Sequence, residues 1–183
     1  IQPVDGRYVT DRAACTVCGE CVTACYADAR QIVGREYSVE EVMAVVERDR
    51  DFYLQSNGGV TFSGGEPLMQ PDFLLAMLQA CKRAGLHTAL DTSGYAAWET
   101  IERVLPYVDL LLYDLKLMDD TGHRQITGVP NRRILDNLHR LSARGLPIWL
   151  RLPLIPGIND DDENLAATAA FAVALPNPAP LYI

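Results

Sequence analysis

Residues 108–116 read VDLLLYDLK, a near-continuous apolar run that ends in two charged side chains. Runs of this kind are typical of parallel strands, which are buried on both faces. Side chains alternate along a strand, so Leu112, Asp114 and Lys116 are predicted to share one face. Charged groups are costly to bury unpaired, so Asp114 and Lys116 need partners. A ligand at the strand end is one candidate, and an Asp114–Lys116 ion pair or contact with water is the alternative.

Similar segments occur on both sides of this run. Further strands are predicted at residues 59–63, 86–92, 147–154 and 179–183, with helices at 39–54, 71–84, 98–105, 131–144 and 163–175. Strict alternation of strand and helix predicts a parallel sheet with helices packed outside it. A closed eight-stranded barrel takes about 250 residues, and only about four or five strands are predicted here. The fold class is therefore α/β, as a partial (β/α) barrel or an open parallel sheet.

A separate segment of the chain is rich in cysteine. Cys15, Cys18, Cys21 and Cys25 have the spacing C-x2-C-x2-C-x3-C, which is the bacterial ferredoxin pattern for iron–sulfur ligands. Cysteines that form a disulfide scaffold would be spread over a short secreted chain, so metal binding is the better interpretation. The fifth cysteine, Cys81, lies among apolar residues of a predicted helix and is expected in the core.

The composition of the chain disfavours some partners and locations. The chain has 183 residues, 49% of them hydrophobic, and a formal net charge of −8. That charge, without a basic cluster in the sequence, disfavours nucleic acid and anionic membranes as partners. No 18-residue apolar run and no signal peptide is present, so a cytoplasmic protein is expected. The chain opens at Ile1 without Met and closes within an apolar run, which predicts a fragment of a longer protein.

The ends of the predicted strands carry most of the candidate site residues, and ligands bind at the C-terminal ends of parallel strands. The candidates are Gly64, Gly65, Glu66, Asp91, Thr92, Ser93, Asp114, Lys116 and Arg151. Gly64 and Gly65 let a backbone approach a ligand, and Glu66 offers a carboxylate suited to an ammonium group. Arg151 needs an anion, either a ligand carboxylate or a neighbouring acid. The Gly64-Gly65-Glu66 sequence is also compatible with an ordinary turn. Thr92 and Ser93, at the end of the second strand, are likewise compatible with a simple turn.

The remaining polar residues are expected to be structural. The three histidines, His87, His123 and His139, show no paired spacing. The acidic stretch at residues 160–163 most simply begins a helix, where carboxylates favour the helix dipole, and a metal site there is the lesser alternative.

Five motifs together resemble the glycyl-radical-enzyme activases of the radical S-adenosylmethionine superfamily, of the pyruvate formate-lyase activating type. The motifs are GGVTFSGGEP at 58–67, LDTSG at 90–94, LYDLK at 112–116, ITGV at 126–129 and RLPLIPG at 151–157. The resemblance implies that a [4Fe–4S] cluster reduces S-adenosylmethionine to methionine and a 5′-deoxyadenosyl radical. That radical takes hydrogen from a glycine of a partner glycyl radical enzyme, and reduced flavodoxin or ferredoxin donates the electron.

The resemblance also assigns roles to residues. Gly64, Gly65 and Glu66 would receive the amino group of S-adenosylmethionine, assisted by Asp91. Lys116 would hold the carboxylate of the same molecule, as a cation suits an anion.

Further cofactor contacts are expected from Thr92, Ser93 and Arg151. The resemblance adds a candidate monovalent-cation site formed by Asp91, Thr92 and Asp114.

The chain departs from the family pattern in its cysteines. The family's C-x3-C-x2-C cluster loop is absent and is expected upstream, so no residue of the catalytic cluster is assigned and this fragment is expected to be inactive. The cysteine run falls where the family has a ferredoxin-like insert, which defines a partial iron–sulfur segment at residues 1–36 and a partial barrel at 37–183. In two-cluster ferredoxins the fourth cysteine ligates the other cluster, so Cys15, Cys18 and Cys21 would lack a fourth ligand here. Tyr26 also replaces the usual Pro after Cys25.

Two other classes of function stay open. Lys116 at a barrel strand end is compatible with a Schiff-base aldolase, which leaves the cysteines unexplained. A non-enzymatic iron–sulfur electron carrier would use the barrel only as a scaffold.

Overall fold

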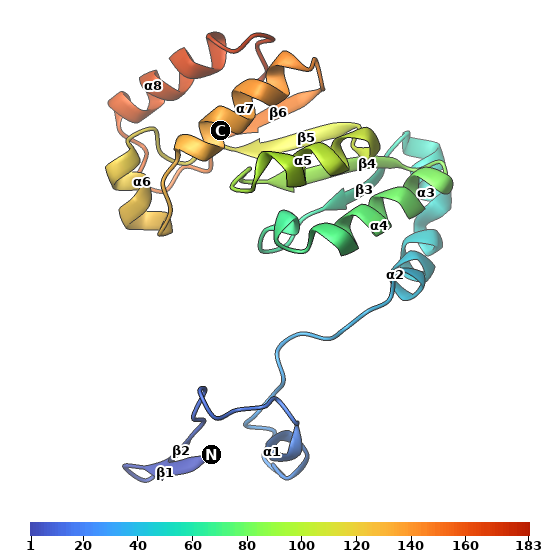
Figure 1. Ribbon diagram of the computed structural model, residues 1–183, viewed down its shortest axis with the longest axis vertical. Helices are drawn as coiled ribbons and strands as arrows, with labels where there is room; N and C mark the ends of the chain where they lie inside the picture. Colours follow the sequence, from blue (N-terminus) through green and yellow to red (C-terminus); the bar gives the residue numbers. More distant parts are fainter. The chain divides into compact units, whose positions relative to one another are not determined.

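The computed structural model describes residues 1–183, and the chain divides into two compact units, Ile1–Ser38 and Val39–Ile183 (Figure 1). The first unit holds an antiparallel hairpin of β1 (Gln2–Val4) and β2 (Arg7–Val9), followed by the short helix α1 (Glu20–Thr23). Strands of three residues are too short for a periodic pattern, so the sequence did not predict them. Asp5 and Gly6 both have positive φ, as a type I′ turn requires, and this Asp-Gly pair is the signal that was missed.

The second unit is built on a parallel sheet of five strands in sequence order. The strands are β3 (Gly59–Phe62), β4 (His87–Thr92), β5 (Leu110–Asp114), β6 (Ile148–Arg151) and β7 (Leu181–Tyr182). Each strand pairs with the next along the chain, as in a (β/α) barrel, but the sheet is open. The predicted α/β class and the partial barrel are confirmed.

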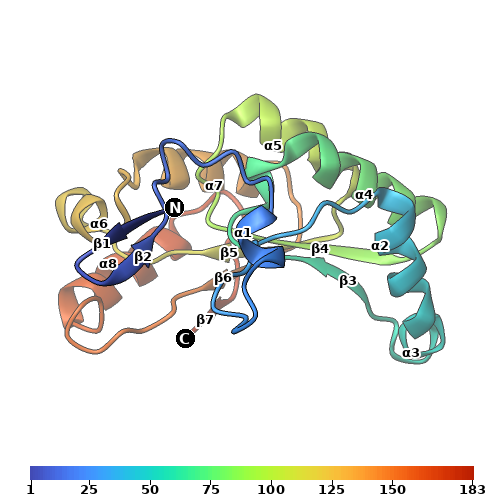
Figure 2. The same ribbon diagram turned by 90° about the horizontal axis from the view of Figure 1, so that it is seen from below.

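Helical segments connect the strands. They are α2 (Val39–Val46), η1 (Glu47–Asp49), α3 (Arg50–Ser56), η2 (Pro67–Met69), α4 (Pro71–Arg83), α5 (Trp98–Val104), η3 (Leu105–Tyr107), α6 (Asp120–Thr127), α7 (Arg132–Ala143) and α8 (Asp162–Val173). Helices α4, α5 and α7 lie along one face of the sheet (Figure 2). All of the predicted helices are present, but the one predicted at 39–54 is divided into α2, η1 and α3. Helix α6 was not predicted because its polar sequence lacks a buried stripe. None of the helices combines the length and the hydrophobicity that a membrane span needs.

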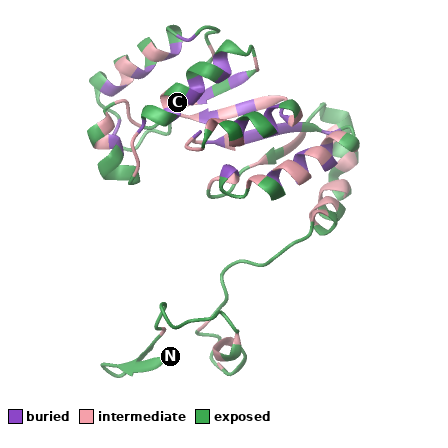
Figure 3. Cartoon of the chain, in the orientation of Figure 1, coloured by how far each residue is buried: buried purple, intermediate pink, exposed green.

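The core lies between the sheet and these helices, as the buried positions in Figure 3 show. Leu111, Tyr113 and Leu115 are each at most 2% exposed, whereas Leu112 and Asp114 on the other face of β5 are only partly buried. The predicted alternation is therefore confirmed, and the helix-free face of the sheet carries the polar side chains. Asp161 caps α8 by accepting a hydrogen bond from the Asn164 backbone, so the acidic stretch begins a helix as expected.

Asp109 lies just before β5 and links that strand to β4 and to helix α4. Its Oδ2 accepts hydrogen bonds from the Thr88 backbone N–H at 2.8 Å, from the Thr88 hydroxyl at 3.2 Å and from Lys82 of α4. Burial alone would raise the pKa of Asp109, but the hydrogen bonds from Lys82 and Thr88 outweigh it and lower the pKa. The charged form is therefore the form that stabilises the fold.

We expect Asp109→Asn to lower the free energy of unfolding at pH 7 by about 1 to 2 kcal/mol, since it removes charge-assisted hydrogen bonds. A folded-state pKa below the ordinary value means that this contribution is present above about pH 4 and is lost as pH falls through the folded pKa. Urea denaturation of the wild type and of Asp109→Asn from pH 3 to pH 7 would measure the gap between their free energies of unfolding. Asp72→Asn, which removes an exposed partner of Arg103, is the matched control and should change little. A gap that stays constant down to pH 3 would contradict the prediction.

Candidate functional site

A cavity of about 270 Å³ lies at the C-terminal ends of β3 to β6. It is lined by Ser63, Gly64, Gly65, Glu66, Asp91, Thr92, Ser93, Asp114, Lys116 and Arg151. The structure thus brings all eight predicted cofactor-binding residues together, along with Asp114. Ser63 was not predicted, although it follows β3 directly, and its hydroxyl donates to Asp91 Oδ2 at 3.1 Å.

Glu66 is held by the end of β4, by the loop that follows β4 and by the backbone of η2. Its Oε1 accepts from the Thr92 hydroxyl at 2.6 Å and from the Leu68 backbone at 3.2 Å. Its Oε2 accepts from the Ser93 backbone at 2.9 Å and from the Ser93 hydroxyl at 2.6 Å. A carboxylate has about four acceptor positions, so the chain itself fills those of Glu66. This residue fixes the two loops to each other and places a negative charge between them.

Arg151 connects the acids of the neighbouring strands. Its Nε donates to Asp114 Oδ1 at 2.9 Å, its Nη2 donates to the same oxygen at 2.7 Å, and its Nη2 also bonds Asp91. Burial lowers the pKa of Arg151, but the hydrogen bonds to Asp114 and Asp91 outweigh this effect and raise it. Of the two anions considered for Arg151, the structure contains the neighbouring acids. The guanidinium also lies between two of the residues of the candidate cation site, which stays a prediction.

Lys116 contrasts with Arg151. Its side chain is exposed and makes no ion pair within the chain, so the alternative Asp114–Lys116 pair does not form. Three carboxylates and two cations line the cavity, which gives a formal charge of −1. The cavity can therefore attract a cationic ligand while Lys116 stays available for an anionic group of that ligand.

Buried asparagines hold the backbone that follows β5. Asn159 Nδ2 donates to the Lys116 carbonyl at 2.7 Å, Asn131 Nδ2 donates to the Met118 carbonyl at 2.7 Å, and Asn164 Oδ1 accepts from the Met118 backbone at 2.8 Å. The three asparagines are 2% to 5% exposed. They fix the direction in which Lys116 leaves the strand, and no sequence pattern marks them as part of the site. Asn131 occupies the N-cap position of α7, but its side chain makes no cap hydrogen bond because it bonds this loop instead.

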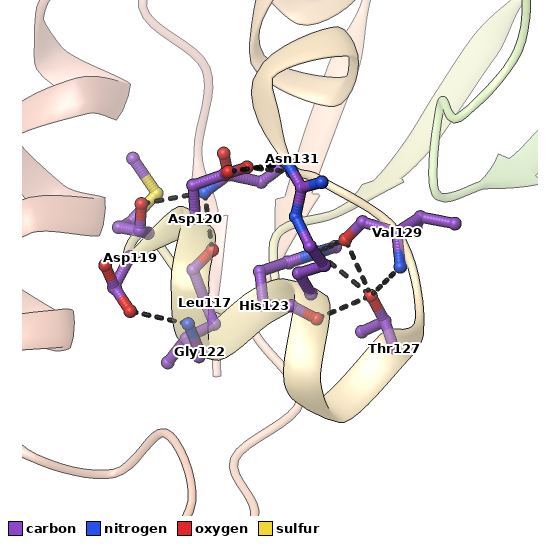
Figure 4. Close-up of polar contacts among 10 residues, drawn as sticks. Leu117, Asp119, Asp120, Gly122, His123, Thr127, Val129 and Asn131 are labelled. Carbon is purple, nitrogen blue, oxygen red and sulfur yellow. Dashed lines mark hydrogen bonds and ion pairs between the residues drawn. The ribbon is translucent and has the colours of Figure 1, made fainter.

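The α6 segment completes this support (Figure 4). Asp119 caps α6 by accepting from the backbone N–H three residues later at 2.6 Å, and Asp120 Oδ1 accepts from the Asn131 backbone at 2.9 Å. The ring Nδ1 of His123 lies 2.7 Å from the Val129 carbonyl, and the residue is 3% exposed. His123 is thus structural, as expected, and α6 serves to fix the loop beside Lys116.

The cysteine segment contains a second cavity, of about 430 Å³, which Cys15, Cys18 and Cys21 line and Cys25 does not. Backbone hydrogen bonds, that of Ala29 first, lower the pKa of the Cys25 thiol, and a metal ligand must be the thiolate. All four thiols are free, and no three of them converge as a metal-binding group. Donor type and spacing fit an iron–sulfur cluster, whose placement on these residues stays a prediction.

The chain also matches known proteins in sequence. The family model of the Radical SAM superfamily matches residues 14–169. The chain belongs to the radical SAM superfamily. Radical SAM proteins use S-adenosylmethionine and a [4Fe–4S] cluster, so the predicted pair of cofactors is that of the family.

Individual relatives show which radical SAM proteins the chain resembles. The chain is 45% identical to the isethionate sulfite-lyase activating enzyme of Nitratidesulfovibrio vulgaris over 91% of this chain and 55% of the relative. It is 50% identical to the trans-4-hydroxy-L-proline dehydratase activating enzyme of Clostridioides difficile over 75% of this chain and 46% of the relative. A crystallised domain of a pyruvate-formate lyase-activating enzyme from Bacteroides vulgatus is 43% identical, with a TM-score of 0.64 over 68% of this chain and 78% of that domain. The chain spans about half the length of the curated relatives it matches.

Proposed function

We propose that this chain is the cofactor-binding core of a glycyl-radical-enzyme activating enzyme. The observation that carries the proposal is the single cavity in which Glu66, Asp91, Asp114, Lys116 and Arg151 meet. Relatives that are called activating enzymes support the same conclusion. The reaction requires one electron from a [4Fe–4S] cluster, which splits S-adenosylmethionine into methionine and a 5′-deoxyadenosyl radical. Transfer of one hydrogen atom from a glycine of the partner then yields 5′-deoxyadenosine and the glycyl radical.

Within the cavity, the chain's own residues divide the binding of S-adenosylmethionine. Lys116, as the cation without a partner, holds the carboxylate of the methionine moiety. Gly64 and Gly65 offer backbone without a Cβ, and Asp91 offers carboxylate oxygens, so these three residues receive the amino group. Glu66 acts mainly by position and charge, because its acceptor positions are already filled. Thr92 and Ser93 hold Glu66, and Arg151 orients Asp91.

The partners follow from the same proposal. The protein substrate is a glycyl radical enzyme, and the electron comes from reduced flavodoxin or ferredoxin. A reduced donor and free thiols are compatible with the cytoplasm, where disulfides are rare.

The test of the proposal uses the protein that the complete coding sequence encodes. The sequence upstream of Ile1 is expected to contain C-x3-C-x2-C. That protein, loaded with clusters and reduced without oxygen, should release 5′-deoxyadenosine from S-adenosylmethionine. A cluster-loaded, reduced protein that gives no 5′-deoxyadenosine would reject the proposal. Trapping of a carbonyl substrate on Lys116 by borohydride would instead favour the aldolase, which the exposed position of Lys116 disfavours because nothing desolvates the amine.

Replacement of Lys116 tests the residue assignment separately. Lys116→Met should weaken binding of S-adenosylmethionine at least about tenfold, because one charge-assisted contact is lost. Equilibrium dialysis of the cluster-loaded protein with labelled S-adenosylmethionine measures the dissociation constant. Arg83→Met is the matched control, since it removes an exposed cation at the end of α4, outside the cavity, and should leave the affinity unchanged. Equal affinities of the two variants would show that Lys116 does not hold the carboxylate.

A further inference from the structure

A further cleft, of about 480 Å³, lies on the helical side of the sheet, between residues 95–99 and helix α7. Its lining includes Arg132, Arg133 and Arg140 from α7. The chain as a whole carries a formal charge of −8, so a cluster of three guanidinium groups in one cleft departs from the rest of the molecule. The sequence did not reveal this cluster because Arg133 and Arg140 are seven residues apart and meet only on the face of a helix.

Two of these arginines stack on aromatic rings. The Arg133 guanidinium lies 5.1 Å from the centre of the Tyr95 ring, and that of Arg140 lies 5.4 Å from the centre of the Trp98 ring. Neither makes an ion pair within the chain, whereas Arg132 lies 3.9 Å from Asp136. A stacked guanidinium keeps the N–H groups along its edge available, and stacking reduces the side-chain freedom that binding would remove.

The spacing of the two free arginines limits what they can bind together. Arg140 lies seven positions after Arg133 in α7, which is a rise of about 10 Å along the helix axis. One phosphate or carboxylate is too small to bridge that distance, but acidic side chains three residues apart in a polyproline II segment lie on one face about 9 Å apart. Two carboxylates, those of Glu99 and Asp136, also line the cleft. Arg132 lies 3.9 Å from Asp136 and offsets its charge, whereas Glu99 would repel a carboxylate near it, so the acids of an occupant would gather at Arg133 and Arg140.

The cleft adjoins the cavity at the strand ends. Asn137 of α7 donates from Nδ2 to the Gly94 carbonyl at 2.9 Å and to the Ala96 carbonyl at 3.0 Å. The same loop begins with Ser93, which holds Glu66 through its backbone and its hydroxyl. An occupant of the cleft therefore lies beside the loop that lines the candidate cofactor site.

We infer that this cleft docks an acidic segment of the protein whose glycine is oxidised. The identity of that partner rests on the proposed function, whereas the electrostatic contact does not. Carboxylates three residues apart bind the edges of Arg133 and Arg140, and this contact places the partner next to the cavity.

The test measures binding of a fluorescein-labelled peptide, (Gly-Ser-Glu)₃, to the 183-residue chain by fluorescence anisotropy at low salt. The matched peptide has Gln in place of each Glu. We expect the Glu peptide alone to bind, and Arg133→Gln with Arg140→Gln to weaken it at least about tenfold through the loss of two charge-assisted contacts. Binding should also weaken as salt is raised. The control pair, Arg48→Gln with Arg83→Gln, removes two exposed cations elsewhere and should leave binding unchanged.

Several outcomes would overturn the inference. They are no binding of the Glu peptide, equal binding of the two peptides, or equal loss in the test and control variants. Displacement of the Glu peptide by inorganic phosphate as readily as by unlabelled peptide would indicate a single-anion site instead. Tighter binding of a labelled oligothymidylate would indicate nucleic acid. None of these measurements involves S-adenosylmethionine, so failure here and failure of the 5′-deoxyadenosine test are distinguishable.

Discussion

Gly94→Ala should destabilise the second unit by about 3 to 5 kcal/mol, because overpacking against a fixed ring and backbone strain add together. A Cβ at Gly94 would lie 1.7 Å from the Tyr113 hydroxyl oxygen and 2.2 Å from its ring carbon Cζ. Tyr113 is fully buried, and its hydroxyl donates to the Ile134 carbonyl at 2.7 Å, so the surrounding core and this hydrogen bond hold the ring in place. Urea denaturation at pH 7 measures the change in the free energy of unfolding.

Gly145→Ala separates the two causes. Gly145 has a φ of +70°, almost the same as the +71° of Gly94, but a Cβ there meets no atom within 4 Å. It should therefore show only the backbone strain, about 1 kcal/mol. In a double-mutant cycle, Tyr113→Leu should reduce the effect of Gly94→Ala, since the clash is lost with the ring. Equal destabilisation by the two glycine variants, or strict additivity in the cycle, would show that the clash is not the cause.

The sequence predicted the parts of the fold that depend on periodic burial. The alternation in VDLLLYDLK predicted which side chains of β5 enter the core, and Leu111, Tyr113 and Leu115 are buried as a result. The ends of parallel strands meet at one edge of a sheet, so the cavity residues were also accessible from strand positions alone. Gly94 itself was predicted only as part of a motif, because its close approach to Tyr113 brings the loop after β4 against β5.

Which side chains of the site bond to one another could not be predicted in the same way. Arg151 of β6 reaches Asp91 of β4 across the intervening strand β5, and only the register of these three strands decides that contact. The asparagines that hold the Lys116 loop lie 13 and 43 residues after the carbonyls to which they donate, where no local pattern marks them. Long-range side-chain hydrogen bonds of this kind depend on packing, not on periodicity.

Arg151→Met should lower the free energy of unfolding at pH 7 by about 2 to 3 kcal/mol, somewhat less than for a fully buried pair, since the side chains of Asp91 and Asp114 are 20% exposed. Methionine keeps much of the length of the side chain but leaves two carboxylates facing each other without a cation. Urea denaturation detects this loss. Arg103→Met, which removes a partner of the exposed Asp72, is the matched control and should have only the small effect of a surface pair.

A triple variant identifies the cause of that loss. The pKa of Arg151 is raised, so in the wild type its contribution is complete below about pH 12 and is lost only as pH rises through the folded pKa. Adding Asp91→Asn and Asp114→Asn to Arg151→Met should recover much of the stability at pH 7, because the two carboxylates that are left without a cation are then removed. No recovery in the triple variant would mean that Arg151 stabilises the sheet by packing and not by holding the two acids.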